Sequence, residues 1–173
     1  MLKKFICGSE KYQLGGPRMD TIILPISFSN LPEKIEVEGY SLTRKSSFHI
    51  SLVCTGKIIE KYKITIPDFL DKVVADFCEF VKENPIELLN WENEFKFVSE
   101  KERRAVITMC DISNLNKFFD HINRKYTLSL EYPPTHATIY TLQPDIGIFI
   151  TDSSDIENLT KPIPSPNLIL SKI

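Results

Sequence analysis

Two histidines in the sequence are each followed, two positions later, by a hydroxyl side chain. His49 precedes Ser51 in the segment His-Ile-Ser, and His136 precedes Thr138 in the segment His-Ala-Thr. Because histidine has an unperturbed pKa of about 6.5, an imidazole can take up or release a proton near neutral pH. A hydroxyl can donate a hydrogen bond to a phosphate oxygen whose charge must be stabilised in a transition state. Two imidazoles and two hydroxyls could therefore cleave a phosphodiester by acid–base chemistry without a metal ion.

The residues around both motifs predict β-strands. The first motif lies in the apolar run 47–54, and the second lies in 135–142. Side chains of a strand alternate between its two faces, so each histidine shares a face with the hydroxyl two residues later. The residues between and beside them are expected to point to a core: Phe48, Ile50 and Leu52 in the first strand, and Thr135, Ala137 and Ile139 in the second.

Three more side chains near the motifs are candidate substrate contacts. Tyr140 follows Thr138 by two residues and is expected on the same face, where it could stack on a base or bind a phosphate. Packing within the sheet is the other role open to it. Arg44 and Lys45 precede the first motif and could contact a phosphate or an RNA backbone. Alternatively, both side chains are solvated in a loop and contact no ligand.

The remaining periodicities predict further strands and two helices. Apolar residues recur every three or four positions from Pro67 to Asn84, and again in a helix capped by Asp111 or Ser113 that ends near Lys125. The turn Thr55-Gly56 is predicted to lead into a strand. The segments expected to be strands, in addition to the two motif strands, are 21–28, 34–38, 57–66, 94–98, 104–110, 147–151 and 167–170.

This order of elements predicts one α+β domain spanning residues 1–173. It would consist of two lobes, each with an antiparallel sheet, a packed helix and one of the two motifs. A doubly wound parallel sheet is not expected, because two helices are too few to cover both of its faces.

Composition and charge exclude several classes of protein. Hydrophobic residues make up 42% of the 173 residues and charged residues 25%, as in ordinary globular domains. The net charge of -2 provides no basic field for coating DNA. The apolar runs are too short for a membrane span or a signal peptide. The four cysteines are scattered without a C-x-x-C pair, which disfavours a zinc cluster and predicts a reduced, cytoplasmic protein. We expect a monomer.

The two motifs with their flanks resemble those of the 2H phosphoesterase superfamily, which includes RNA 2′,3′-cyclic phosphodiesterases and 2′-5′ RNA ligase-like proteins. The resemblance rests on GYSLTRKSSFHISLV before and through the first motif and on PPTHATIYT around the second, within residues 38–151. It implies a bilobal α+β fold with a central cleft and no cofactor. It also implies that His49 and His136 are catalytic and that Ser51 and Thr138 bind the phosphate.

By the same resemblance, the substrate would be a nucleotide or RNA end that carries a 2′,3′-cyclic phosphate. One histidine would activate water, the other would protonate the leaving ribose oxygen, and a 2′-phosphate would remain. Three other readings of the two motifs stay open: a non-catalytic module that binds nucleotides or RNA ends, a metal site completed by a carboxylate, and a purely structural role. Hydroxyls two residues after each histidine are a poor match to a metal site.

Overall fold

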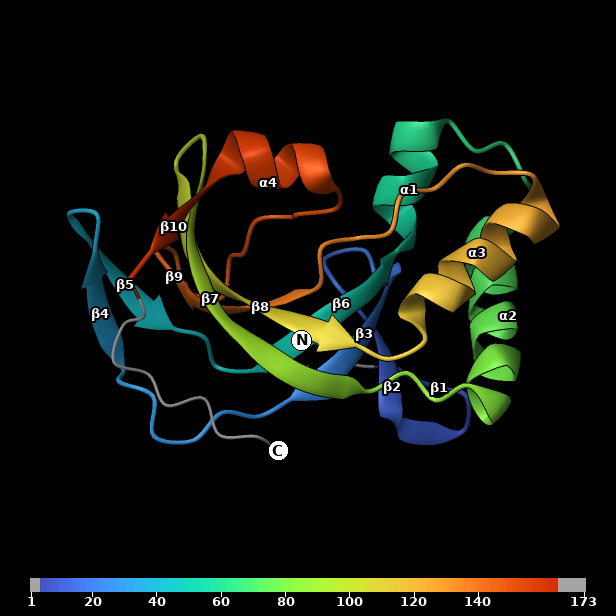
Figure 1. Ribbon diagram of the computed structural model, residues 1–173, viewed down its shortest axis with the longest axis horizontal. Helices are drawn as coiled ribbons and strands as arrows, with labels where there is room; N and C mark the ends of the chain where they lie inside the picture. The colour runs from blue at the N-terminus through green and yellow to red at the C-terminus, as the bar shows by residue number, and fades with distance from the viewer. Residues whose placement is uncertain (1–3, 165–173) are drawn as a thin grey trace. The chain divides into compact units, whose positions relative to one another are not determined.

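The computed structural model describes residues 4–164, which form an α+β fold as the sequence predicts. This range contains ten strands, paired mostly antiparallel, and four helices (Figure 1). The chain divides into two compact units made of interleaved segments. Unit 1 comprises Met1–Pro25, Ser51–Leu88 and Ile112–Tyr132, and unit 2 comprises Ile26–Ile50, Leu89–Asp111 and Pro133–Ile173.

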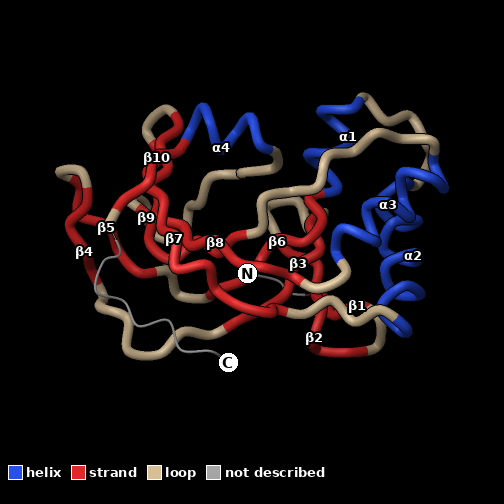
Figure 2. Tube along the Cα trace, viewed as in Figure 1, coloured by secondary structure: helices blue, strands red, loops and turns tan. Residues whose placement is uncertain are grey.

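Unit 1 packs three helices with an N-terminal group of strands. Helices α2 and α3 lie side by side (Figures 1 and 2). They contact each other through the rings of Phe77 and Phe118, which meet edge to face with centroids 5.2 Å apart. The Tyr126 hydroxyl also donates a 2.6 Å hydrogen bond to Asp76. The elements are β1 (Lys4–Ile6), β2 (Ser9–Gly15), β3 (Thr21–Ile26), the second half of β6 (Phe48–Cys54), α1 (Thr55–Tyr62), α2 (Phe69–Glu83) and α3 (Leu115–Tyr126).

Unit 2 contains the first half of β6 and most of the remaining strands. Its strand order is β6–β9–β8–β7–β10, and β5 pairs with both β4 and β9. The elements are β4 (Lys34–Val37), β5 (Tyr40–Arg44), β7 (Leu88–Glu100), β8 (Arg103–Ile112), β9 (His136–Thr141), α4 (Ser153–Leu159) and β10 (Thr160–Ile163).

Two apolar clusters cover the two faces of strand β8 in unit 2. Cluster A consists of Leu31, Leu42, Phe95, Phe97, Val106, Ile139 and Tyr140. Cluster B consists of Val98, Ala105, Ile107, Met109, Ile148 and Ile150. Val106 belongs to cluster A, whereas its neighbours Ala105 and Ile107 belong to cluster B. Because strand side chains alternate, the two clusters lie on opposite faces.

Several elements agree with the sequence predictions. The two predicted helices are α2 and α3, and predicted strands correspond to β3, β4, β6, β7, β8 and β9. The cap predicted for α3 is wrong, because Asn114 occupies that position with φ of 58°. The Ser113 hydroxyl instead donates to the Pro85 carbonyl and accepts from the Glu87 amide. The predicted strand 167–170 lies outside the described residues.

The predicted strand 57–66 is wrong, because residues Thr55–Tyr62 form helix α1. The buried residues Thr55, Gly56 and Ile58 fall on one side of this short helix. Its first turn lies against the carboxylate of Asp20, and a negative charge stabilises a helix N-terminus. The helix ends at Lys63 in a left-handed conformation, with φ of 51°.

Two further predictions are corrected by the structure. Residues 147–151 form irregular backbone in place of a strand, although Ile148 and Ile150 are buried in cluster B. Helices α2 and α3 both belong to unit 1, and the two histidines both belong to unit 2. The predicted division of these two helices and two motifs between the lobes is therefore not confirmed, because each unit combines segments from both halves of the chain. Within residues 4–164, the helix of unit 2 is α4, which the sequence did not predict.

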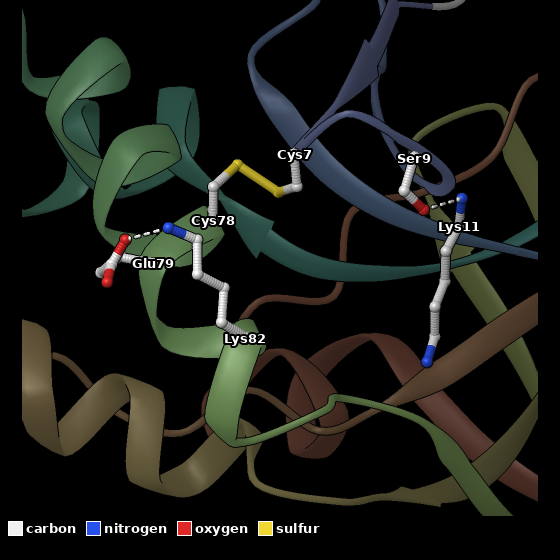
Figure 3. Close-up of a disulfide and its surroundings, with 6 residues drawn as sticks. All are labelled: Cys7, Ser9, Lys11, Cys78, Glu79 and Lys82. Carbon is white, nitrogen blue, oxygen red and sulfur yellow. Dashed lines mark hydrogen bonds and ion pairs between the residues drawn. A yellow bond between two sulfur atoms is a disulfide. The ribbon is translucent and has the colours of Figure 1, made fainter.

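The prediction that all cysteines are reduced is also wrong, because Cys7 and Cys78 form a disulfide (Figure 3). The bond joins the turn between β1 and β2 to helix α2, and its Cα atoms are 4.8 Å apart. Disulfides persist in oxidising environments, so the cysteines no longer favour a cytoplasmic location. Cys54 and Cys110 are free thiols, and burial raises the pKa of each to about 12. No helix within residues 4–164 has the length and apolar character needed to cross a membrane.

Removing the disulfide with Cys7→Ser/Cys78→Ser should lower the free energy of unfolding by about 2–4 kcal/mol, because the bond closes a long loop in the unfolded chain. The two cysteines are 71 residues apart. Denaturant unfolding followed by Trp91 fluorescence measures the change, and wild-type protein with reductant should match the variant. Four reactive thiols in unfolded, unreduced protein would contradict the bond, since two are expected.

Replacing Gly56 should destabilise the protein even though alanine normally favours a helix. A methyl group at this position would overlap the carboxylate of Asp20. We expect Gly56→Ala to cost about 1–3 kcal/mol, as overpacking does. Thermal unfolding of Gly56→Ala, Asp20→Ala and the double variant measures the coupling. If the double variant recovers none of the loss, the overlap does not explain this glycine.

Candidate functional site

The site is built on the antiparallel pairing of β6 with β9. Ile50 lies opposite Ala137, and both side chains are fully buried. Continuing this register by one residue places His49 opposite Thr138, on the other face of the two strands. His136 lies two residues before Thr138 and is the diagonal neighbour of His49. Diagonal neighbours have Cα atoms roughly 7–8 Å apart, so the two imidazoles can reach opposite sides of one phosphate.

His136 is held in one orientation by its own chain. Its side chain is 9% exposed, and Nδ1 lies 2.8 Å from the carbonyl oxygen of Pro134. Because a carbonyl only accepts, Nδ1 carries the proton of this hydrogen bond and leaves the lone pair of the neutral ring on Nε2. Burial lowers the pKa of His136, and the bond to Pro134 offsets only part of that effect. His136 is therefore a neutral imidazole whose Nε2 can accept a hydrogen bond or a proton.

The face that carries the motif residues can be identified from strand β8. Met109 lies opposite His136, and Ile107 lies opposite Thr138. Directly opposed residues share a face, and both β8 residues belong to cluster B. Thr138 also lies close to Gly147, since a Cβ atom built on that glycine would be 3.8 Å from the threonine hydroxyl oxygen. The motif residues of unit 2 therefore share the cluster B face with the segment 143–150.

A bulge in β9 removes Tyr140 from this face. The register passes from Ile107 opposite Thr138 to Val106 opposite Tyr140, which leaves Ile139 as the extra residue. Tyr140 is fully buried in cluster A, and its hydroxyl donates a 2.8 Å hydrogen bond to the Pro32 carbonyl. The strand alternation that predicted a shared face with His136 breaks at this bulge. Tyr140 has the packing role and offers no surface to a ligand.

The two cations before the first motif have different surroundings. Arg44 lies opposite Tyr140, and its guanidinium donates a 2.6 Å hydrogen bond to the Leu31 carbonyl, so it is directed to the cluster A side. Lys45 follows it, donates its backbone amide to the Ile139 carbonyl and is buried. Lys45 is thus the buried member of this pair, and no contact between its side chain and the motif residues is seen in residues 4–164.

Asp145 and Ser46 organise the loop before the first motif. The Ser46 amide and hydroxyl each donate a 2.8 Å hydrogen bond to the Asp145 carboxylate. These bonds lower the pKa of Asp145. The two residues are 99 positions apart, so no local pattern could have paired them.

Ser51 follows His49 by two residues in β6 and is half-buried. It is the first residue of unit 1, whereas His49, His136 and Thr138 belong to unit 2. The candidate site within unit 2 therefore consists of those three residues. The structure neither adds to nor removes the predicted role of Ser51.

Comparison with known proteins gives no further guide to this site. The chain matches no family model, no curated protein and no solved structure. Within residues 4–164, no group of three or more histidine, cysteine, aspartate or glutamate side chains is arranged to hold a metal ion.

The environment of His136 predicts a pH-dependent stability. Its folded-state pKa is lowered from 6.5, so the unfolded chain binds the proton first as the pH falls. The stability present above pH 6.5 should therefore be lost progressively as the pH falls below 6.5. In His136→Asn, the amide can still donate to Pro134 but cannot titrate. Urea unfolding should show a shallower pH slope for this variant, and equal slopes would contradict the inferred burial.

Proposed function

We propose that the chain is a metal-independent phosphodiesterase that hydrolyses a 2′,3′-cyclic phosphate or a related nucleotide or RNA phosphodiester. The observation that carries this proposal is the placement of His49, Thr138 and His136 on one face of two adjacent antiparallel strands. Two imidazoles on diagonal positions with a hydroxyl between them match the needs of an in-line displacement at phosphorus. The resemblance of both motifs to 2H phosphoesterases, with their bilobal fold and central cleft, points to the same reaction.

In the proposed reaction, His136 acts as the general base and His49 as the general acid. His136 Nε2 takes a proton from water while the water oxygen forms a bond to phosphorus. The bond from phosphorus to one ribose oxygen breaks, and His49 gives that oxygen a proton. The Thr138 hydroxyl donates a hydrogen bond to a non-bridging phosphate oxygen. Solvent then returns a proton to His49 and removes one from His136, so the net reaction adds one water.

This assignment follows from the hydrogen bond between His136 and Pro134. The bond fixes the proton on Nδ1 and leaves Nε2 as an acceptor, and burial favours the neutral ring. Ser51 would bind a second phosphate oxygen by its resemblance to the family motif, but His49 and His136 of unit 2 suffice for the proton transfers. A cytoplasmic location stays a prediction, to be tested by whether the Cys7–Cys78 bond persists in the cell.

A non-catalytic nucleotide-binding module is the second candidate. The observation in its favour is the small exposure of His136, because a general base must exchange its proton with solvent in each turnover. Such a module would bind a 2′-nucleotide without hydrolysing a cyclic one.

The proposal predicts hydrolysis of adenosine 2′,3′-cyclic phosphate in excess chelator. His49→Ala and His136→Asn should each lower kcat by roughly 10²- to 10⁴-fold, the usual contribution of a general acid or base. Chromatographic separation of the cyclic nucleotide from its monophosphate product measures the rates.

The control is His121→Ala, which removes the third histidine, a residue of α3 in unit 1. It should retain wild-type activity. Loss of activity with chelator, or full activity in His49→Ala, would count against the metal-free reaction. Tight nucleotide binding without turnover would favour the binding module.

A further inference from the structure

Gly147 is a glycine that neither backbone conformation nor packing explains. All six glycines of the chain lie within the described range 4–164. Three of them have positive φ, which favours glycine, and a Cβ atom added at two others would overlap a neighbouring side chain. Gly147 is not among the glycines with positive φ, and a Cβ atom added to it would contact Thr138 at an ordinary distance. Because alanine would fit here, the glycine calls for another reason.

A side chain at position 147 would cover one side of the Thr138 hydroxyl. The atoms nearest to the added Cβ atom are Oγ1 and Cγ2 of Thr138, at 3.8 and 3.9 Å. Thr138 is half-buried, whereas Ala137 and Ile139 on either side of it in β9 are fully buried. A phosphate oxygen must come within about 2.7–2.8 Å of the hydroxyl oxygen to accept its hydrogen bond. A branched side chain at position 147 would take up part of the space that this approach needs.

The segment that carries Gly147 is held on both sides, so a larger residue cannot displace it without cost. On one side, the Asp145 carboxylate accepts two hydrogen bonds of 2.8 Å from Ser46. On the other side, Ile148 is 5% exposed and packs in cluster B. The polar contact and the apolar contact together keep the backbone of Gly147 beside Thr138.

We propose that Gly147 is a specificity-determining residue of the phosphate site, because it keeps the Thr138 hydroxyl open to a non-bridging oxygen of the substrate. This role rests on the proposed function, in which Thr138 donates that hydrogen bond. Glycine admits a phosphate group beside the bare backbone, whereas a branched residue at the same position excludes it. The size of residue 147 thus sets how closely a tetrahedral phosphate can approach Thr138.

A double-mutant cycle measured by equilibrium binding tests this role. Calorimetry with adenosine 2′-monophosphate would compare wild type, Gly147→Val, Thr138→Val and the double variant. We expect each single variant to bind roughly 10- to 100-fold more weakly, the usual loss when a hydrogen bond to a charged group is removed. The double variant should bind no more weakly than Thr138→Val, because both changes remove the same hydrogen bond. Gly147→Ala adds only one methyl group and should cause a smaller loss.

The matched control is Gln143→Val, which places the same side chain at an exposed position of the same segment and should leave binding unchanged. If wild type binds and hydrolyses the nucleotides but Gly147→Val binds as tightly, the role of Gly147 is wrong and the proposed function stands. The role is also wrong if Gly147→Val costs as much in the Thr138→Val background as in wild type.

Thermal unfolding identifies the variants that fold. If Gly147→Val does not fold, Gly147→Ala decides, and an affinity equal to that of wild type contradicts the proposed role. If wild type neither binds adenosine 2′-monophosphate nor hydrolyses the cyclic nucleotide, both proposals are wrong.

Discussion

The position of every candidate residue in unit 2 depends on the pairing of Ile50 with Ala137. Both side chains are fully buried on one face, so the strands cannot slip by one residue without exposing them. That register places His49 opposite Thr138 and diagonal to His136. Hydrophobic burial on one side of β6 and β9 thus fixes the polar geometry on the other side.

Two irregularities interrupt this pairing and change which side chains lie on the face of the site. Arg44 pairs with Tyr140 and Ile50 pairs with Ala137. Between these two pairs, the chain that leads from β5 to β6 has five residues, 45–49, whereas β9 has only two, 138 and 139. The excess residues form a loop that Asp145 holds through Ser46. The extra residue in β9 turns Tyr140 into cluster A and brings Thr141 back to the motif face. Bulges beside functional sites commonly redirect side chains in this way.

Sequence periodicity predicted the long elements and the orientation of the motif strands. The apolar spacing of α2 and α3 and the alternation around His49 are local properties, so one chain is enough to read them. Helix α1 was missed because its eight residues contain too few apolar positions to separate a helix from a strand. The β9 bulge misplaced Tyr140, because a single inserted residue reverses every later side chain.

The features that sequence could not predict are long-range. The Cys7–Cys78 bond and the Ser46–Asp145 contact each join segments that only the folded chain brings together. The buried state of Lys45 also depends on its neighbours, because an isolated Arg-Lys pair before a strand suggests a solvated loop. The role of the Pro134 carbonyl in orienting His136 likewise depends on the folded backbone geometry, which the sequence does not reveal.

The central claim is that His49 and His136 contact the same phosphate. Proton NMR of the imidazole C2 resonances during titration with adenosine 2′-monophosphate tests this claim directly. We predict that both resonances shift along one saturation curve, while the resonance of His121 in unit 1 stays in place. A shift of only one of the two histidines, or separate saturation curves for them, would contradict the account.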